Sequence, residues 1–127
     1  DLIDFNYKTF GEENLEFKTL DIAIDDLPKA DCVLIRQVLQ HLSNKEVQNI
    51  VKKLSNFKYV ILTEHLPLKD FIPNKDIISG QGIRLKKLSG LDLLKSPFNF
   101  NVKNEKQLVS ISLEDKTCIK TTLFEVF

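Results

Sequence analysis

The 127-residue sequence contains no methionine and no tryptophan, and it has only two cysteines, four glycines and four prolines. Its 18 basic and 18 acidic residues leave no net charge, so it lacks the basic excess typical of proteins that bind nucleic acids or membrane surfaces. No apolar run approaches the roughly 20 residues that a membrane span needs. The N-terminus also lacks the basic and apolar blocks of a signal peptide. We therefore expect a cytoplasmic protein with no nucleic-acid partner and no membrane association.

The sequence lacks the residue patterns of several common kinds of functional site. The two cysteines, Cys32 and Cys118, are too few for a disulfide framework, and we expect reduced core residues rather than a bridge. With His41 and His65 they show no metal-ligand spacing, so we expect no metal site. The two glycines of residues 80–82 follow no predicted strand, which argues against a phosphate-binding loop. No hydrolase or protease signature is present.

The middle of the chain predicts a strand, a helix and a second strand. Cys32–Ile35 and Tyr59–Thr63 are uninterrupted apolar runs, typical of parallel strands that are buried on both faces. Between them, Ser43 and Glu46 form a capping box that marks a helix start. Apolar residues follow at helical spacing: Val47, Ile50, Val51 and Leu54. This order predicts a right-handed crossover in a parallel sheet.

The flanking regions complete an α/β fold in one domain, residues 1–127. A helix is predicted to end at Gly11, and the alternation in residues 15–20 predicts a short strand near a sheet edge. Residues 64–106 are irregular, and a segment of this length in a compact domain is usually functional or partly structured. Alternating residues on both sides of a turn at 114–116 predict a C-terminal antiparallel hairpin.

Ligands of open α/β sheets bind beyond the carboxyl ends of the parallel strands. We therefore consider the polar residues that lie at those ends as candidates for a functional site. They are Asp21 with its neighbour Ile22, Arg36, Gln37, His41, Glu64 and His65.

At these positions the sequence resembles class I S-adenosylmethionine-dependent methyltransferases. In that family a strand that ends in Asp is followed by a pattern close to the run LPKADCVLIRQVLQHLS at residues 27–43. Residues 58–63 resemble the family's fifth strand, the terminal hairpin resembles its last two strands, and residues 74–100 resemble one bacterial branch. The resemblance covers nearly the whole chain and is densest at residues 20–65.

The resemblance implies a Rossmann-like methyltransferase sheet, mostly parallel, with a C-terminal antiparallel hairpin. It implies methyl transfer from S-adenosylmethionine to an unidentified small-molecule acceptor. The alternative is a non-catalytic module of the same scaffold that binds a nucleotide or a partner protein, because fold alone does not separate the two.

The family's first two strands and its glycine-rich loop have no counterpart in these residues. We therefore expect them to be the C-terminal portion of a larger domain, inactive in methyl transfer when alone. The strand at residues 32–35 would otherwise leave an unpaired apolar edge. A preceding segment, a second copy of the chain or a rearranged sheet is expected to complete the sheet.

The resemblance also implies roles for single residues. Asp21 would accept a hydrogen bond from the adenine amino group, and the backbone of Ile22 would contact the ring edge. Arg36 and Gln37 would line the cleft for cofactor and substrate.

Three residues are candidates for the acceptor side. His41 is either a base or a structural residue that ties the loop to the helix. Glu64 and His65 either face the substrate or lie in a surface loop. The irregular segment should cover the acceptor, and its basic residues hint at an anionic one: Arg84, Lys86, Lys87 and Lys95.

Overall fold

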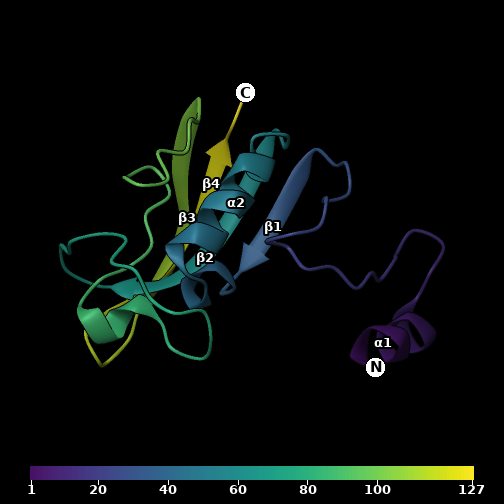
Figure 1. Ribbon diagram of the computed structural model, residues 1–127, viewed down its shortest axis with the longest axis horizontal. Coiled ribbons are helices and arrows are strands. Elements are labelled where there is room, and N and C mark those ends of the chain that lie inside the picture. The colour runs from purple at the N-terminus through teal and green to yellow at the C-terminus, as the bar shows by residue number, and fades with distance from the viewer.

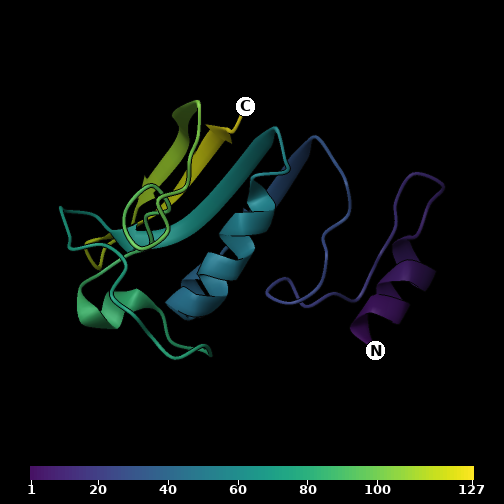
Figure 2. The same ribbon diagram turned by 45° about the horizontal axis from the view of Figure 1, so that its top comes forward.

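The computed structural model describes all of residues 1–127 and centres on one four-stranded sheet (Figure 1). The strands are β1 (Cys32–Arg36), β2 (Tyr59–Pro67), β3 (Asn104–Ser112) and β4 (Thr117–Glu125). Their order across the sheet is β1-β2-β4-β3. Helix α2 (Asn44–Leu54) lies across one face of this sheet, as Figures 1 and 2 show.

The predicted parallel strand pair joined by a helix and the predicted hairpin are confirmed, but the prediction of a mostly parallel sheet is wrong. β1 and β2 pair in parallel through α2, from Cys32 opposite Tyr59 to Arg36 opposite Thr63. The β3–β4 hairpin then packs with β4 directly against β2, and both of those pairings are antiparallel. Only one of the three strand pairs is therefore parallel, and β1 is an edge strand.

Residues 15–20 do not form the predicted strand. They make only one isolated bridge, between Glu12 and Leu15, and Leu15 and Leu20 are exposed. A segment with an alternating pattern becomes a strand only when a neighbouring strand pairs with its backbone N–H and C=O groups. No strand of the sheet lies beside residues 15–20.

The helix predicted to end at Gly11 is confirmed as α1 (Leu2–Phe10), capped by Asp1 and followed by Gly11. It stands apart from the sheet in both views (Figures 1 and 2). None of its residues is buried, and Phe5 and Phe10 are exposed. No helix in the structure is both long enough and apolar enough to cross a membrane.

The start of α2 is fixed by its predicted cap. The Ser43 hydroxyl accepts a hydrogen bond from the Glu46 amide at 3.3 Å. Ser79 completes the cap, because its hydroxyl accepts from the Ser43 amide and donates to the Glu46 carboxylate. One face of the helix then enters the core through Val47, Ile50, Val51 and Leu54.

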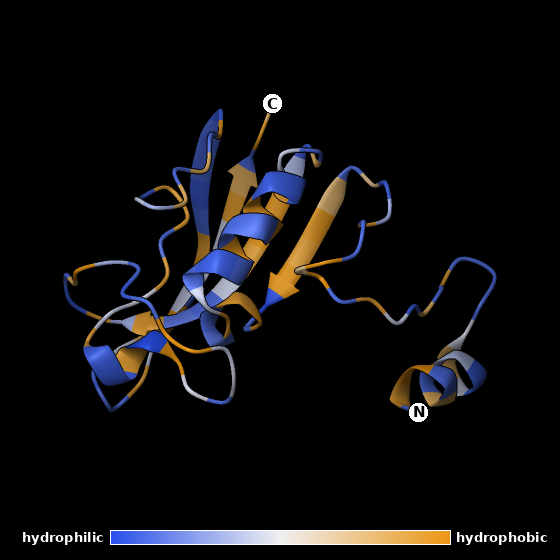
Figure 3. Cartoon of the chain, in the orientation of Figure 1, coloured by the Kyte–Doolittle hydropathy of each residue, from blue (hydrophilic) through white to orange (hydrophobic).

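The core lies on one face of the sheet only. Ile35, Val60 and Leu62 point toward α2 and are buried, and Figure 3 shows the apolar strands behind the polar outer face of this helix. No helix covers the opposite face, where Leu34 keeps 72% of its surface exposed. The prediction that residues 32–35 are buried on both faces is therefore wrong, because this apolar run has a packing partner on one side only.

Matched substitutions in β1 should distinguish its two faces. We expect Ile35→Val to lower the free energy of unfolding by about 1 kcal/mol, because Ile35 is only 4% exposed. Leu34→Val should change it by less than about 0.5 kcal/mol, because the side chain is mostly in solvent. Urea unfolding measures both; equal losses would contradict the one-sided packing.

Buried polar side chains organise the irregular segment. Asn74 bonds to the backbone of Asp92 and Ser96, and Arg84 bonds to the backbone of Leu42. The segment has one short helix, η2 (Arg84–Lys87). It is therefore folded against the sheet without a regular helix of its own.

Candidate functional site

Arg36 and Gln37 lie where β1 ends, as their place in the sequence predicts. Arg36 is exposed and pairs across the ladder with Thr63 of β2. The Gln37 amide donates to the Thr63 carbonyl at 2.8 Å, and Gln37 adopts a left-handed backbone with φ of 53°. Such a conformation costs a non-glycine residue on the order of 1 kcal/mol and is concentrated at functional sites. The strand end thus has a sharply turned backbone next to polar groups.

The short helix η1 (Leu39–His41) follows and is tied to β2 by Gln40. The Gln40 side chain is 6% exposed, and its oxygen accepts from the His65 amide at 2.7 Å. Its amide nitrogen lies 3.5 Å from Nε2 of His41. Gln40 was not among the predicted residues, although it lies in the sequence between Gln37 and His41, which were predicted.

His41 is half-buried, and its Nδ1 atom is buried without a hydrogen-bond partner. Its backbone carbonyl accepts from the Gly80 amide at 2.9 Å. The residue thus joins the irregular segment to η1 through its backbone, and its ring stays beside Gln40.

The expectation that Glu64 and His65 follow a strand, or lie in a surface loop, is wrong, because β2 continues to Pro67 and pairs with β4 at both residues. Their side chains point to opposite faces of β2, because successive side chains of a strand alternate. The His65 ring lies on the uncovered face, 2.7 Å from the Thr117 hydroxyl. That hydroxyl donates to the Asp115 carboxylate, so Nε2 of His65 is the donor to Thr117. The hydrogen bond from Thr117 lowers the pKa of Asp115, and the nearby charge of His65 contributes. His41, Glu64 and His65 therefore do not form one catalytic cluster.

Glu64 is an unusual side chain for a protein interior. It is 3% exposed, and neither carboxyl oxygen has a hydrogen-bond partner. Burial raises the pKa of Glu64 to about 8. The charge of Arg84 opposes this in part, and so does the Gln40 backbone amide, which lies near the carboxyl group but is not placed to hydrogen-bond to it. The carboxyl group is thus mostly protonated and neutral at pH 7.

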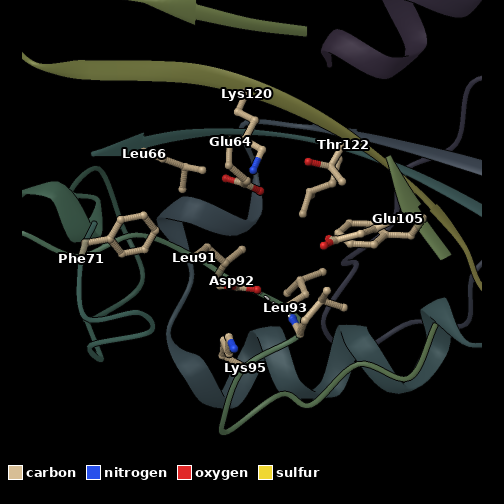
Figure 4. Close-up of a pocket in the computed structure, with 13 residues that line it drawn as sticks. Glu64, Leu66, Phe71, Leu91, Asp92, Leu93, Lys95, Glu105, Lys120 and Thr122 are labelled. Carbon is tan, nitrogen blue, oxygen red and sulfur yellow. Dashed lines mark hydrogen bonds between the residues drawn. The ribbon is translucent and has the colours of Figure 1, made fainter. Parts of the chain in front are cut away.

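Glu64 faces a cavity of about 340 Å³ (Figure 4). Side chains of β2 and β4 form one wall, and residues 91–95 form the facing wall. Figure 4 shows the Glu64 carboxyl pointing into this space, with Lys120 and Thr122 of β4 on the same side. The polar residues of the lining are Glu64, Asp92, Lys95, Glu105, Lys120 and Thr122.

Asp21 is exposed and holds a tight turn rather than a strand end. Its Oδ1 atom accepts from the Ala23 amide at 3.0 Å, and Ala23 is part of the core. Lys53, in the last turn of α2, donates to the carbonyls of Ile22 and Asp25. No hydrogen bond joins this turn to Arg36 or Gln37.

The basic residues of the irregular segment do not form one patch. Arg84 is 2% exposed, and its guanidinium donates to the Leu42 carbonyl and the Asn44 side chain. Burial lowers the pKa of Arg84, although nearby carboxyl groups oppose this. Lys87 donates to the Asp76 carbonyl, and Lys95 lines the cavity. The prediction that these residues gather toward an anionic acceptor is wrong for Arg84, which has a structural role.

Neither cysteine is in a disulfide, since Cys32 and Cys118 are both free. The structure contains no group of three histidine, cysteine or carboxylate side chains that could hold a metal ion.

Neither a protein-family model nor a curated protein matches this chain. Two solved structures are similar to it, both of the N-terminal domain of EvdMO1, one in the presence of SAH and D-fucose and the other with SAH bound. Each aligns with a TM-score of 0.65 at 15% sequence identity and covers 98% of this chain. The chain spans 60% and 59% of the length of those two chains. It thus has a mixed α/β fold similar to that of a domain that binds SAH.

Proposed function

We propose that the chain is part of an S-adenosylmethionine-dependent methyltransferase domain that acts on a small molecule. In this proposal it forms the portion that binds the adenine of the cofactor and that carries the C-terminal hairpin. The observation that carries this proposal is the strand order β1-β2-β4-β3, in which β4 is inserted antiparallel between β2 and β3. Nearly the whole chain aligns on a domain solved with SAH, which is the product left when S-adenosylmethionine has donated its methyl group.

The residues present fit the adenosine part of the cofactor. Asp21 uses only Oδ1 within its turn, so Oδ2 is available to accept a hydrogen bond from the adenine amino group. Arg36 is exposed at the end of β1, and the turned backbone of Gln37 leaves the strand beside it. We propose that these three residues hold the cofactor, together with the backbone of Ile22.

Methyl transfer requires little acid–base catalysis by the protein, because the bound cofactor supplies an activated methyl group. Alignment of donor and acceptor therefore supplies much of the rate acceleration. A hydroxyl acceptor still needs a group that takes its proton. His65 is the candidate at this end of β2, because its ring lies on the uncovered face and is oriented by Thr117. An acceptor rich in hydroxyl groups is supported by the presence of D-fucose in one similar structure.

Calorimetric titration with SAH tests this function, because SAH binds without turnover. We expect Asp21→Ala to weaken the binding by about 5- to 100-fold, the equivalent of about 1–3 kcal/mol for a lost hydrogen-bond partner. Asp26→Ala is the matched control, since Asp26 is an exposed acid in the same loop. No heat at millimolar SAH would favour the alternative of a non-catalytic module. Equal effects of the two variants would contradict the role of Asp21.

A further inference from the structure

Glu64 and the cavity beside it are not used by the proposed cofactor site. The carboxyl group is on the face of β2 that α2 covers, whereas Arg36 and His65 are on the other face. We propose that this cavity is a binding site for a neutral, polyhydroxylated small molecule of monosaccharide size, anchored by Glu64.

The position of the cavity follows from the register of the sheet. Leu62, Glu64 and Leu66 are alternate residues of β2, so their side chains share one face. Lys120 and Thr122 are the partners of Glu64 and Leu62 on β4, and they extend the same face. Rigid strands thus hold the polar groups, which a precise binding site requires.

The volume sets the size of the ligand. About 340 Å³ is near the lower end of the range of about 300–1,000 Å³ for pockets that hold small molecules. This is room for a single sugar ring or a similar polyol, but not for a dinucleotide. Phe71, Leu91, Leu93 and Phe124 supply apolar walls for the C–H faces of such a ring.

Glu64 sets the chemistry of the anchor. A protonated carboxyl group offers one donor and also accepts hydrogen bonds, and neither oxygen has a partner here. A buried polar group without a partner is unfavourable, so a ligand that supplies one gains affinity. A hydroxyl group suits this position because it donates and accepts at once.

The charges around Glu64 favour a neutral ligand. Lys95 and Lys120 are balanced by Asp92 and Glu105 in the cavity wall. Neither lysine is in an ion pair, and the buried Arg84 adds a positive charge close to Glu64. An ammonium group beside Glu64 would meet the positive charge of Arg84, and the wall, whose two lysines equal its two carboxylates in number, gives an anion no net attraction.

Three sugars of one size test the site: D-glucose is neutral, D-glucosamine is cationic and D-glucuronate is anionic. Two-dimensional NMR titration of the full chain follows the backbone amides. We expect D-glucose to shift the amides of residues 64–66, 91–95 and 120–124, with millimolar affinity, and the two charged sugars to bind at least about 3-fold more weakly. No shift at about 50 mM D-glucose would overturn the proposal. Tighter binding of D-glucosamine, or shifts confined to other residues, would also overturn it.

Variants of Glu64 then distinguish its hydrogen bonds to the ligand from its effect on the packing of the protein. Glu64→Gln keeps a donor and an acceptor and should retain D-glucose affinity within about 3-fold, whereas Glu64→Leu should lose at least about 10-fold. Glu114→Leu, in the exposed hairpin turn, is the control and should leave the affinity unchanged. Thr122→Val changes the cavity wall without a change of volume and should weaken binding by about 3-fold, even where Glu64→Leu fails to fold. Unchanged affinity in both Glu64→Leu and Thr122→Val would overturn the site. The titration needs no cofactor, so its result is independent of SAH binding.

Discussion

Replacement of Asn74 by alanine is expected to lower the free energy of unfolding by about 3–4 kcal/mol. Asn74 is 6% exposed, and its side-chain oxygen accepts from the Asp92 amide at 2.8 Å. Its amide nitrogen donates to the carbonyls of Asp92 and Ser96 at 2.8 and 3.0 Å. Alanine would leave these backbone groups without partners inside the protein. It would also place alanine at a left-handed position, with φ of 61°, that asparagine tolerates better.

Asn99→Ala separates the two contributions. Asn99 is also left-handed, with φ of 45°, but it is exposed. We expect this control to lose about 1 kcal/mol or less, the cost of the backbone conformation alone. Urea unfolding of the two variants gives the difference, which measures the buried hydrogen bonds. Equal losses in the two variants would show that Asn74 does not hold the irregular segment together.

The parts of the fold that the sequence predicted are those set by local patterns. The cap at Ser43 and the helical spacing after it define α2, and the turn at residues 114–116 defines the hairpin. Each of these signals lies within a few consecutive residues, so it can be interpreted without knowing which other segments pack against it. Residues 15–20 have an equally clear alternation, but a strand also needs a partner, and the sequence does not show whether one is adjacent.

The candidate site was predicted less completely, for a related reason. Position at a predicted strand end identified Arg36, Gln37 and Glu64, but not the face on which each side chain lies, and β2 in fact continues past Glu64 to Pro67. The alternation of Glu64 with Leu62 and Leu66 was a usable signal, because it places Glu64 on the same face as two apolar residues. Arg84 gave no such signal, since its surroundings in the irregular segment have no periodicity.

Glu64 should make the stability of the protein depend on pH in an unusual direction. The pKa of Glu64 is about 8 in the folded state, whereas the ordinary pKa of a glutamate side chain is 4.5. Between these two values the folded state holds a proton that the unfolded state has released. The free energy of unfolding therefore falls as pH rises from about 4.5, and it levels off above about 8. The stabilisation that comes from the protonated Glu64 carboxyl is fully present below pH 4.5, and it is lost above the folded-state pKa of about 8.

Glu64→Gln isolates this contribution, because glutamine has no proton to release over the same range. We expect the stability of the native protein relative to this variant to fall by on the order of 4 kcal/mol between about pH 4.5 and 8. Urea unfolding of both proteins at several pH values measures the difference. Glu114→Gln should follow the native protein at every pH, since Glu114 is exposed in the hairpin turn. A difference between the native protein and Glu64→Gln that stays constant with pH would mean that the Glu64 carboxyl is solvated in solution, and that the cavity wall is open to water there.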